Sequence, residues 1–425
     1  MRTLSACLTA LLLALSTAGL PRATSTPVAA QQRPPRPIRE SDDPPPPKIR
    51  REVEQDDTLG RDYFYPPGVR PTPQDVDADG IPDAVEQRML DRFAPTFVHD
   101  RRESHYPAAV EDYLPQVALM FRHKDCEDHV ALGLGQVNTR SLLRQVHPGG
   151  CAHTVGSHAS NAPLKGDEFF YMFLSSCTRW TTHCQREARD NCAGNPDPQC
   201  QSKEMIRCLR ERRREERMLI RRGETLDEGA LCEDIGILRG YQDLSRLRAY
   251  AAVRPSGFAR NGYNIYVRVF YPVSAQEGSF LGLVGPFGEH AADWEGVSMH
   301  VTREGQLVGV TYNAHGKKTY VPASGVIRDP ADGVRPLVYV AAQSHAMYTR
   351  AGQDGRGPLK PTDYHWGNGF AFPTRGRILN VGRTGHAMRG FEWTEYRGPW
   401  GEDWDPTTLP VIGDVEGASP KTPTF

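Results

Sequence analysis

Apolar and polar residues alternate with a period of two along several stretches of the second half of the chain. The clearest stretch runs from Tyr263 to Tyr271, and further ones begin at Asp293, Leu307 and Leu337. Alternation with this period predicts β-strands that bury one face. Turns rich in Gly and Pro separate the stretches, and long helical patterns are few. The pattern therefore predicts a mainly β protein, an antiparallel β-sandwich.

Shorter apolar stretches extend this prediction toward the N-terminus. Strands are expected from Ala94 to Val98 and from Val117 to Phe121, and the continuous apolar run over 167–176 suits the interior of a sheet. Before them, residues 84–93 have helical periodicity, with one apolar side formed by Val85, Met89, Leu90 and Phe93. We therefore expect one helix that leads into a β-sandwich domain over 94–410.

The two ends of the chain have a different composition. Residues 1–30 combine a basic start, an apolar run and small residues suited to cleavage, which indicates a secretory signal peptide. Residues 31–74 are rich in Pro and charge and lack apolar periodicity, so they predict a disordered linker, and 411–425 predict a disordered tail. No other stretch is long and apolar enough to span a bilayer. We expect a secreted or otherwise exported protein whose contact with a membrane is at most peripheral.

The formal net charge of -1 gives no reason to expect a nucleic-acid partner. Apart from Cys7 in the signal segment, the cysteines are even in number, which in an exported chain predicts disulfides. Zinc is the alternative, but no C-x-x-C pair occurs. The segment 177–232 holds most of these cysteines and a basic helix from Gln201 with interspersed Glu, so we expect a disulfide-stapled helical insertion. The eight cysteines are Cys126, Cys151, Cys177, Cys184, Cys192, Cys200, Cys208 and Cys232.

Residues 75–86, DVDADGIPDAVE, satisfy the calcium-loop pattern D-x-D-x-D-G-x-x-x-x-x-E. Carboxylates packed this densely would repel one another without a cation, and Gly80 permits the sharp turn. The predicted Ca²⁺ ligands are Asp75, Asp77, Asp79, the carbonyl of Ile81, Asp83 and Glu86. Pro82 departs from the EF-hand pattern, and the segment is more similar to the loops of thrombospondin type 3 repeats. Because only one copy is present, we expect a structural brace; an acidic solvated turn is the alternative.

A second candidate site is formed by His290, Asp293 and Glu295. On a strand that begins at Asp293, the two carboxylates share a face, and His290 in the preceding turn can reach the same point. One imidazole and two carboxylates suit a divalent cation such as Mg²⁺, Ca²⁺ or Mn²⁺. His315 and His345, at the ends of the next predicted strands, are further candidate ligands. The alternative is that the acids pair with arginines.

The motif H-x-x-D-W-E formed by these residues resembles the G-H-x-x-D-W-E heptad of the necrosis- and ethylene-inducing-peptide-like toxins, with Glu289 in place of the Gly. The resemblance implies a β-sandwich in which the His, Asp and Glu bind a divalent cation where a lipid-linked sugar docks. The His-Ala-Ala that starts the motif here differs from the His-Arg-His of the toxins, so toxicity is not implied.

More of the chain resembles the vacuolar protein sorting-associated protein 62 family and its plant and bacterial relatives. Seven blocks occur in the family's order: APTFVHDRRESHYPAAVEDYL from Ala94, AYAAVRP from Ala249, NIYVRVFYPVS from Asn264, HAADWEGVSMHV from His290, TYNAHG from Thr311, RPLVYVAAQSHAMYTRAG from Arg335 and EYRGPWG from Glu395. The resemblance covers most of 94–401 apart from the cysteine-rich segment. It agrees with a β-sandwich and implies no biochemical activity.

Three functional hypotheses follow from the sequence. In the first, the protein is a non-enzymatic module whose bound cation bridges to a glycan or glycolipid headgroup at a membrane or cell surface. In the second, it is a metal-assisted hydrolase in which His315 or His345 is the general base. In the third, both cation sites only stabilise an exported scaffold. No G-x-S-x-G, H-E-x-x-H or Walker-type loop names a reaction, which favours the first over the second.

Overall fold

The computed structural model describes most of the chain between residues 71 and 401. Short gaps occur at 124–125, 127, 163–167, 175–177, 198–199, 202, 206, 209–210, 212–236, 238, 242, 257–261, 275–276, 281–282, 287–289 and 356–361. The predicted signal peptide, most of the linker and the predicted tail lie outside the described residues.

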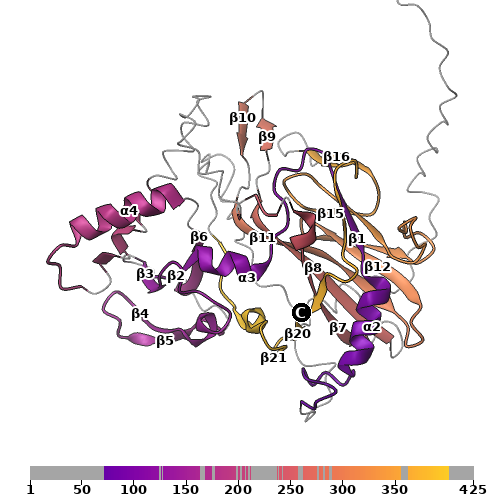
Figure 1. The fold of residues 1–425 in the computed structure, drawn as a ribbon, viewed down its shortest axis with the longest axis horizontal. Coiled ribbons are helices and arrows are strands. Elements are labelled where there is room, and N and C mark those ends of the chain that lie inside the picture. Colours follow the sequence, from indigo (N-terminus) through magenta and orange to yellow (C-terminus); the bar gives the residue numbers. More distant parts are fainter. Residues whose placement is uncertain are drawn as a thin grey trace, which may run out of the picture. The chain divides into compact units, whose positions relative to one another are not determined.

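A six-stranded sheet forms one layer of the sandwich, in the order β13-β12-β11-β8-β7-β19. Its long strands β8 and β11 are antiparallel over their whole overlap, from His290 opposite Ser274 to Val301 opposite Tyr263, and Figure 1 shows them beside β7 and β12. Only β19 joins in parallel, against β7. The strands are β7 (Ala249–Ser256), β8 (Gly262–Ser274), β11 (His290–Val301), β12 (Leu307–Ala314), β13 (Lys317–Pro322) and β19 (Ile378–Asn380).

A four-stranded sheet, in the order β15-β14-β1-β18, provides the second layer. Its members are β1 (Thr96–His99), β14 (Leu337–Val340), β15 (Met347–Tyr348) and β18 (Ala371–Pro373). Buried residues of both sheets belong to one hydrophobic core, including Phe97, Val338 and Phe372 from the smaller sheet and Val267, Val297 and Val310 from the larger one. The predicted mainly β, antiparallel sandwich is therefore confirmed, with the parallel pairs β1–β14 and β7–β19 as local exceptions.

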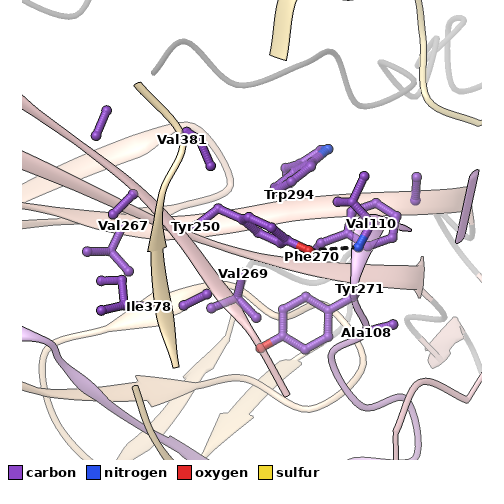
Figure 2. Close-up of a cluster of buried hydrophobic side chains, with 14 of the residues drawn as sticks. Ala108, Val110, Tyr250, Val267, Val269, Phe270, Tyr271, Trp294, Ile378 and Val381 are labelled. Carbon is purple, nitrogen blue, oxygen red and sulfur yellow. Dashed lines mark hydrogen bonds between the residues drawn. The ribbon is translucent and has the colours of Figure 1, made fainter. Parts of the chain in front are cut away.

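Aromatic side chains fill the centre of this core. Tyr250, Phe270 and Trp294 come from three neighbouring strands, and Figure 2 shows them gathered with the aliphatic residues of β8. The Tyr250 hydroxyl accepts a hydrogen bond of 2.8 Å from the backbone N–H of Val110, which satisfies a buried polar group at the start of a short helix. Trp294 packs on the fully buried Trp393, with ring centroids 5.3 Å apart. The Trp of the H-x-x-D-W-E motif is thus a core residue.

Smaller strands and helices surround the sandwich. A three-stranded sheet has the order β3-β2-β6 and comprises β2 (Val117–Arg122), β3 (His129–Leu132) and β6 (Phe169–Leu174). The hairpins are β4 (Val146–Gly149) with β5 (Val155–Ala159), β9 (Glu277–Phe280) with β10 (Leu283–Pro286), β16 (Gly352–Gly355) with β17 (Thr362–His365), and β20 (Gly382–Arg383) with β21 (His386–Ala387). The helices are α2 (Asp83–Phe93), α3 (Val110–Tyr113) and α4 (Thr178–Asn191), with 3₁₀ turns at Leu114–Gln116, Ser141–Arg144, Leu244–Arg246 and Glu392–Glu395.

Three disulfides occur among the described residues: Cys126–Cys151, Cys184–Cys208 and Cys192–Cys200. The last two tie α4 to the segment around Cys200 and Cys208, where the described residues are helical. Cys177, Cys232 and most of the predicted basic helix lie outside the described residues. Disulfides of this number are typical of proteins from oxidising compartments. Among the described residues, no helix is both long enough and apolar enough to cross a bilayer.

Two predicted strand boundaries are wrong, and both concern candidate site residues. His290 is the first residue of β11, although the sequence placed it in a turn before the strand. β14 ends at Val340, and His345 lies in the tight loop before β15, although the sequence predicted one strand that ends at His345. The loop reverses the chain with positive φ at Gln343 (64°) and His345 (53°), a conformation that periodicity cannot reveal.

Candidate functional site

The predicted calcium loop folds into a tight turn at the N-terminal end of α2. Gly80 has φ of 90°, as the pattern requires, and Ala78 also has a positive φ of 57°. Both oxygens of Asp75 accept backbone N–H groups, from Asp79 at 3.1 Å and from Gly80 at 3.0 Å. The turn therefore folds around its first carboxylate.

The carboxylates of this loop converge, and three of them are buried. Asp75, Asp77 and Asp83 form one group whose ligand atoms lie within 4.8 Å of one another, and Asp77, Asp79 and Glu86 form a second such group. The exposed fractions of Asp77, Asp79 and Glu86 are 1%, 0% and 0%. The loop thus concentrates negative charge where water cannot screen it.

Several of these buried oxygens have no hydrogen-bond partner: both Oδ atoms of Asp77, Oδ2 of Asp79 and Oε1 of Glu86. Each buried and unsatisfied acceptor costs about 1–3 kcal/mol, and more if it is charged. A divalent cation with a preference for oxygen ligands would satisfy all four at once. The donor set therefore fits Ca²⁺.

The pKa values of these groups reflect the crowding. Burial, followed by the charge of Asp75, raises the pKa of Asp77 to about 7. Burial and the charge of Asp77 raise the pKa of Asp79 to about 8 and that of Glu86 to about 10. Without a cation, the folded loop holds protons that ordinary carboxyl groups would have released at neutral pH.

Residues from the far end of the chain hold the loop in place. Arg383 donates from Nε to the carbonyl oxygen of Asp77 at 2.7 Å and from Nη2 to that of Ala78 at 3.1 Å. Asn380, in β19, donates from Nδ2 to Oε2 of Glu86 at 3.0 Å. Because β19 pairs with β7 of the large sheet, these contacts attach the loop and α2 to the sandwich. The charge of Arg383 lowers the pKa of Asp79, but this effect is smaller than those of burial and of Asp77, which raise it.

The H-x-x-D-W-E residues lie at the start of β11, but they do not gather into one cluster. His290, Asp293 and Glu295 are not among the groups of described residues whose ligand atoms converge within 4.8 Å. Nδ1 of His290 is 2.9 Å from the carbonyl oxygen of Ala292, a residue with a positive φ of 58°. This local turn directs the imidazole to its own backbone. The second cation site thus stays a prediction that the side-chain positions do not favour.

Asp293 instead pairs with His345, one of the two further histidines named from the sequence. Nδ1 of His345 lies 2.8 Å from Oδ2 of Asp293, and its Nε2 lies 3.6 Å from Oε2 of Glu103. The His345 ring is fully buried and stacks on Tyr271, with ring centroids 3.7 Å apart and planes 6° apart. The hydroxyl of Tyr271 is in turn 2.9 Å from Nε2 of His99. A buried histidine therefore lies between two carboxylates.

The charges of this cluster follow from its geometry. Although burial opposes it, the charge of Glu103 and the contact with Asp293 raise the pKa of His345 to about 10. Burial would raise the pKa of Glu103, but the charge of His345 lowers it to about 2. Burial and the charge of Asp293 raise the pKa of Glu295 well above its ordinary value. At neutral pH the imidazole of His345 is therefore charged, and it lies between the carboxyl groups of Asp293 and Glu103, while burial shifts Glu295 toward its protonated form.

His315, the second of the two additional histidines named from the sequence, lies apart from this cluster. It follows β12 with a positive φ of 51°, and its Nε2 is 2.5 Å from Oδ2 of Asp363 in β17. Asp363 also accepts hydrogen bonds from the hydroxyls of Ser344, at 2.9 Å, and Tyr348, at 2.5 Å. Asp363 is therefore the centre of a second polar network, which includes Ser344 of the loop that carries His345.

Sequence reasoning missed two sets of residues. Glu103 and Tyr271 complete the His345 cluster, yet they come from separate parts of the chain. A group of four histidines, at 123, 129, 147 and 153, also converges with ligand atoms within 4.8 Å. Burial lowers the pKa of His129 to about 4 and also lowers that of His147. The signal available in the sequence was the repeated spacing of six residues between the two histidines of each pair.

Comparisons with known proteins agree with part of the sequence resemblance. The model of the family described as vacuolar protein sorting-associated protein 62 matches residues 237–361. The putative vacuolar protein sorting-associated protein TDA6 of Saccharomyces cerevisiae is 25% identical over 170 residues, which cover 33% of this chain and 35% of that protein. The chain therefore spans about a third of the length of this relative. The family match includes the H-x-x-D-W-E motif but neither the acidic loop nor the four histidines.

Solved structures show a fainter similarity. Two are described as NLPPya in complex with glucosamine and NLPPya in complex with mannosamine, each with a TM-score of 0.21 and 16% identity. They match 35% of this chain and 57% and 56% of theirs, respectively.

Proposed function

We propose that this chain is an exported, calcium-dependent β-sandwich protein in which one Ca²⁺ at residues 75–86 fastens α2 to the sandwich. The observation that carries the proposal is the set of four buried carboxylate oxygens of Asp77, Asp79 and Glu86 that lack hydrogen-bond partners. The ligands would be Asp75, Asp77, Asp79, the carbonyl of Ile81, Asp83 and Glu86. With one loop, the ion has a structural role instead of a sensing one.

Calcium would couple the two ends of the domain. The loop contacts Asn380 and Arg383, near the C-terminal end of the described residues, so an ion that orders the loop also orders these contacts. Extracellular calcium modules bind with Kd values of about 10⁻⁴ to 10⁻³ M. At about a tenfold excess over Kd, which is about 1 mM Ca²⁺ for the tighter of these values, binding to the folded state alone adds about 1.4 kcal/mol to the free energy of unfolding. The protein would then be stable outside a cell and less stable where calcium is scarce.

Thermal unfolding of the full chain in CaCl₂, MgCl₂ and EGTA tests this proposal. We expect the melting temperature to rise with Ca²⁺ and much less with Mg²⁺, which demands a stricter octahedral geometry. In Glu86→Gln the calcium response should disappear. Its melting temperature in EGTA should stay near that of the wild type, because Gln resembles the protonated Glu86 of the calcium-free loop. Asp91→Asn, an exposed position of the same helix, is the matched control and should respond like the wild type. Equal melting temperatures of the wild type in CaCl₂ and EGTA would overturn the proposal.

For the ligand of the sandwich we propose a glycan or glycolipid headgroup, bound without turnover. The support is the H-x-x-D-W-E motif at the start of β11. The buried cluster disfavours a hydrolase in which His345 is the general base, because an imidazole whose pKa is raised to about 10 is already protonated at neutral pH. His290 is the residue of the motif whose replacement disturbs the cluster least, since its ring contacts backbone carbonyls.

Binding to glycan arrays and glycolipid vesicles, in CaCl₂ and in EGTA, tests the ligand separately from the calcium brace. Binding by the wild type that falls in His290→Ala, while the calcium response of the melting temperature is unchanged, would support it. The absence of glycan binding in a chain that still responds to calcium would reject the ligand and leave the brace intact.

A further inference from the structure

A group of four histidines lies apart from both sites described above. His123 follows β2, His129 begins β3, His147 lies in β4, and His153 lies in the turn between β4 and β5. All six pairs of rings are close, with centroid distances of 4.7 to 6.0 Å. Each ring offers a nitrogen, and these atoms lie within 4.8 Å of one another. Four imidazoles thus meet at one point although they come from two strands, the residue after a third strand, and a turn.

The covalent structure holds the two histidine pairs together. The disulfide Cys126–Cys151 joins the loop between His123 and His129 to the loop between His147 and His153, with Cα atoms 5.6 Å apart. The disulfide therefore holds the pair His123 and His129 close to the pair His147 and His153. A bridge at this place fixes the distance between the pairs before any ion is bound, which lowers the entropic cost of assembling a site.

The orientation of the rings is also fixed. Nδ1 of His147 is 2.6 Å from the carbonyl oxygen of Pro148, so this nitrogen is the donor and Nε2 keeps its lone pair. The same ring stacks on Phe121, with centroids 4.5 Å apart. A histidine that binds a metal through one ring nitrogen typically donates a hydrogen bond from the other, often to a backbone carbonyl.

His123 gives an independent indication of a missing partner. Its exposed fraction is 3%, and neither of its ring nitrogens has a hydrogen-bond partner. Glu168 lies behind it, with Oε1 3.5 Å from Nδ1, and this oxygen accepts the N–H of Gly150 at 2.8 Å. A carboxylate placed behind a ligating imidazole orients the ring and increases its basicity. The other nitrogen of His123 remains buried and unsatisfied, which is costly unless an ion accepts its lone pair.

We propose that His123, His129, His147 and His153 form a structural site for a transition-metal ion of the Zn²⁺ class. Imidazole nitrogens suit Zn²⁺, Cu²⁺ and Ni²⁺, whereas Ca²⁺ and Mg²⁺ prefer oxygen ligands. Zn–N bonds of about 2.0–2.1 Å require ligand nitrogens no more than about 4.2 Å apart, so small rotations of the rings suffice. Four protein ligands leave no open position for a substrate, which makes the role structural instead of catalytic. The ion would brace the β4–β5 hairpin against β2 and β3, independently of the calcium loop.

Zinc titration of the full chain, stripped of metal and then supplied with excess CaCl₂, tests this site. We expect one Zn²⁺ per chain, a higher melting temperature, and, with Co²⁺ in its place, the intense visible absorption of tetrahedral coordination. Because His153 is exposed, His153→Ala should retain the native fold. Its affinity for Zn²⁺ should decrease at least about tenfold, since even residues that only hydrogen-bond to a metal ligand cause a loss of this size when they are replaced. His129→Ala should show the same loss.

Two control variants test whether the loss of Zn²⁺ affinity is specific to replacements within the four-histidine group. His386→Ala, in β21, removes a histidine outside the group and should bind Zn²⁺ like the wild type. Glu86→Gln should lose the calcium response but keep Zn²⁺ binding, so the two sites can fail separately. The proposal would be overturned if the wild type bound no Zn²⁺ in excess CaCl₂, or if His153→Ala and His129→Ala bound it as tightly as the wild type.

Discussion

Nδ1 of His345 lies 2.8 Å from Oδ2 of Asp293, inside the sandwich, where water does not reach the imidazole. The same ring faces Glu103 through its other nitrogen, at 3.6 Å. Two segments that are far apart in the sequence, the loop after β14 and the chain after β1, are thereby held at the start of β11. Asp293 of the H-x-x-D-W-E motif thus has a structural partner, His345, and any ligand that binds Asp293 would have to bind beside this partner or displace it.

Replacement of His345 by Gln should destabilise the fold by about 3–5 kcal/mol, because it leaves Asp293 and Glu103 buried without a cation. Chemical denaturation of both proteins measures this difference. The His345→Gln side chain still fills most of the space of the ring, so the loss reports mainly on charge. His386→Gln, in the half-buried hairpin β20–β21, is the control and should change the free energy of unfolding little.

The same difference should depend on pH in a defined direction. The folded pKa of His345 is about 10, above its ordinary value of 6.5, so its stabilisation is complete below pH 6.5 and is lost as the pH rises through 10. The folded pKa of Glu103 is about 2, below 4.5, so its stabilisation is present above pH 4.5 and is lost as the pH falls through 2. The gap between wild type and His345→Gln should therefore be widest between pH 4.5 and 6.5. A gap that is constant up to pH 10 would contradict the buried imidazolium.

In EGTA, the acidic loop should make the protein less stable as the pH rises. The folded pKa values of Asp77 and Asp79, about 7 and 8, lie above their ordinary value of 3.8, so the calcium-free folded state holds protons that the unfolded chain releases. Stability in EGTA should fall from about pH 4 through pH 8, and the raised pKa of Glu86, about 10, extends the fall toward pH 10; CaCl₂ should remove this slope. Melting curves at several pH values in both buffers measure it. A slope that is the same in EGTA and CaCl₂ would mean that the ion does not bind these carboxylates.

Asn380→Ala should weaken calcium binding about tenfold or more, because outer contacts of metal ligands typically have effects of this size. Asn380 donates to Oε2 of Glu86 and accepts the N–H of Gly382, so it fixes both the ligand and the turn beneath it. Calcium titration followed by the melting temperature gives the midpoint for each protein. An unchanged midpoint would show that the contact with β19 does not position the loop.

Trp294→Ala should destabilise the protein by about 3–5 kcal/mol without changing the midpoint of the calcium titration. Trp294 packs within 5.3 Å of Trp393 and of Trp400, ring centroid to ring centroid, and lies in the core away from the acidic loop. Trp294→Phe keeps part of this packing and should lose less. Calcium binding that disappears in Trp294→Phe, at a temperature where the variant is folded, would contradict this separation.

The strands and the acidic loop could be predicted because their signals are local. The alternation over 263–271 predicts the strand β8, although not that both of its faces are buried, since Tyr266 and Phe270 are buried as well as Val267. The spacing of Asp75, Asp77 and Asp79 predicts the turn. The surroundings of His345 could not be predicted in the same way, because they depend on two positive φ angles and on Glu103, 242 positions earlier in the numbering. The four-histidine group depends on a disulfide between loops, and pairing of cysteines cannot be deduced from spacing.

Diffraction from crystals grown in CaCl₂, recorded at a wavelength where calcium scatters anomalously, tests the calcium brace most directly. We predict one strong anomalous peak enclosed by the carboxylates of Asp75, Asp77, Asp79 and Glu86, with oxygen atoms at about 2.3–2.6 Å. A map without a peak there, with those oxygens bound by water or by an arginine, would contradict the account.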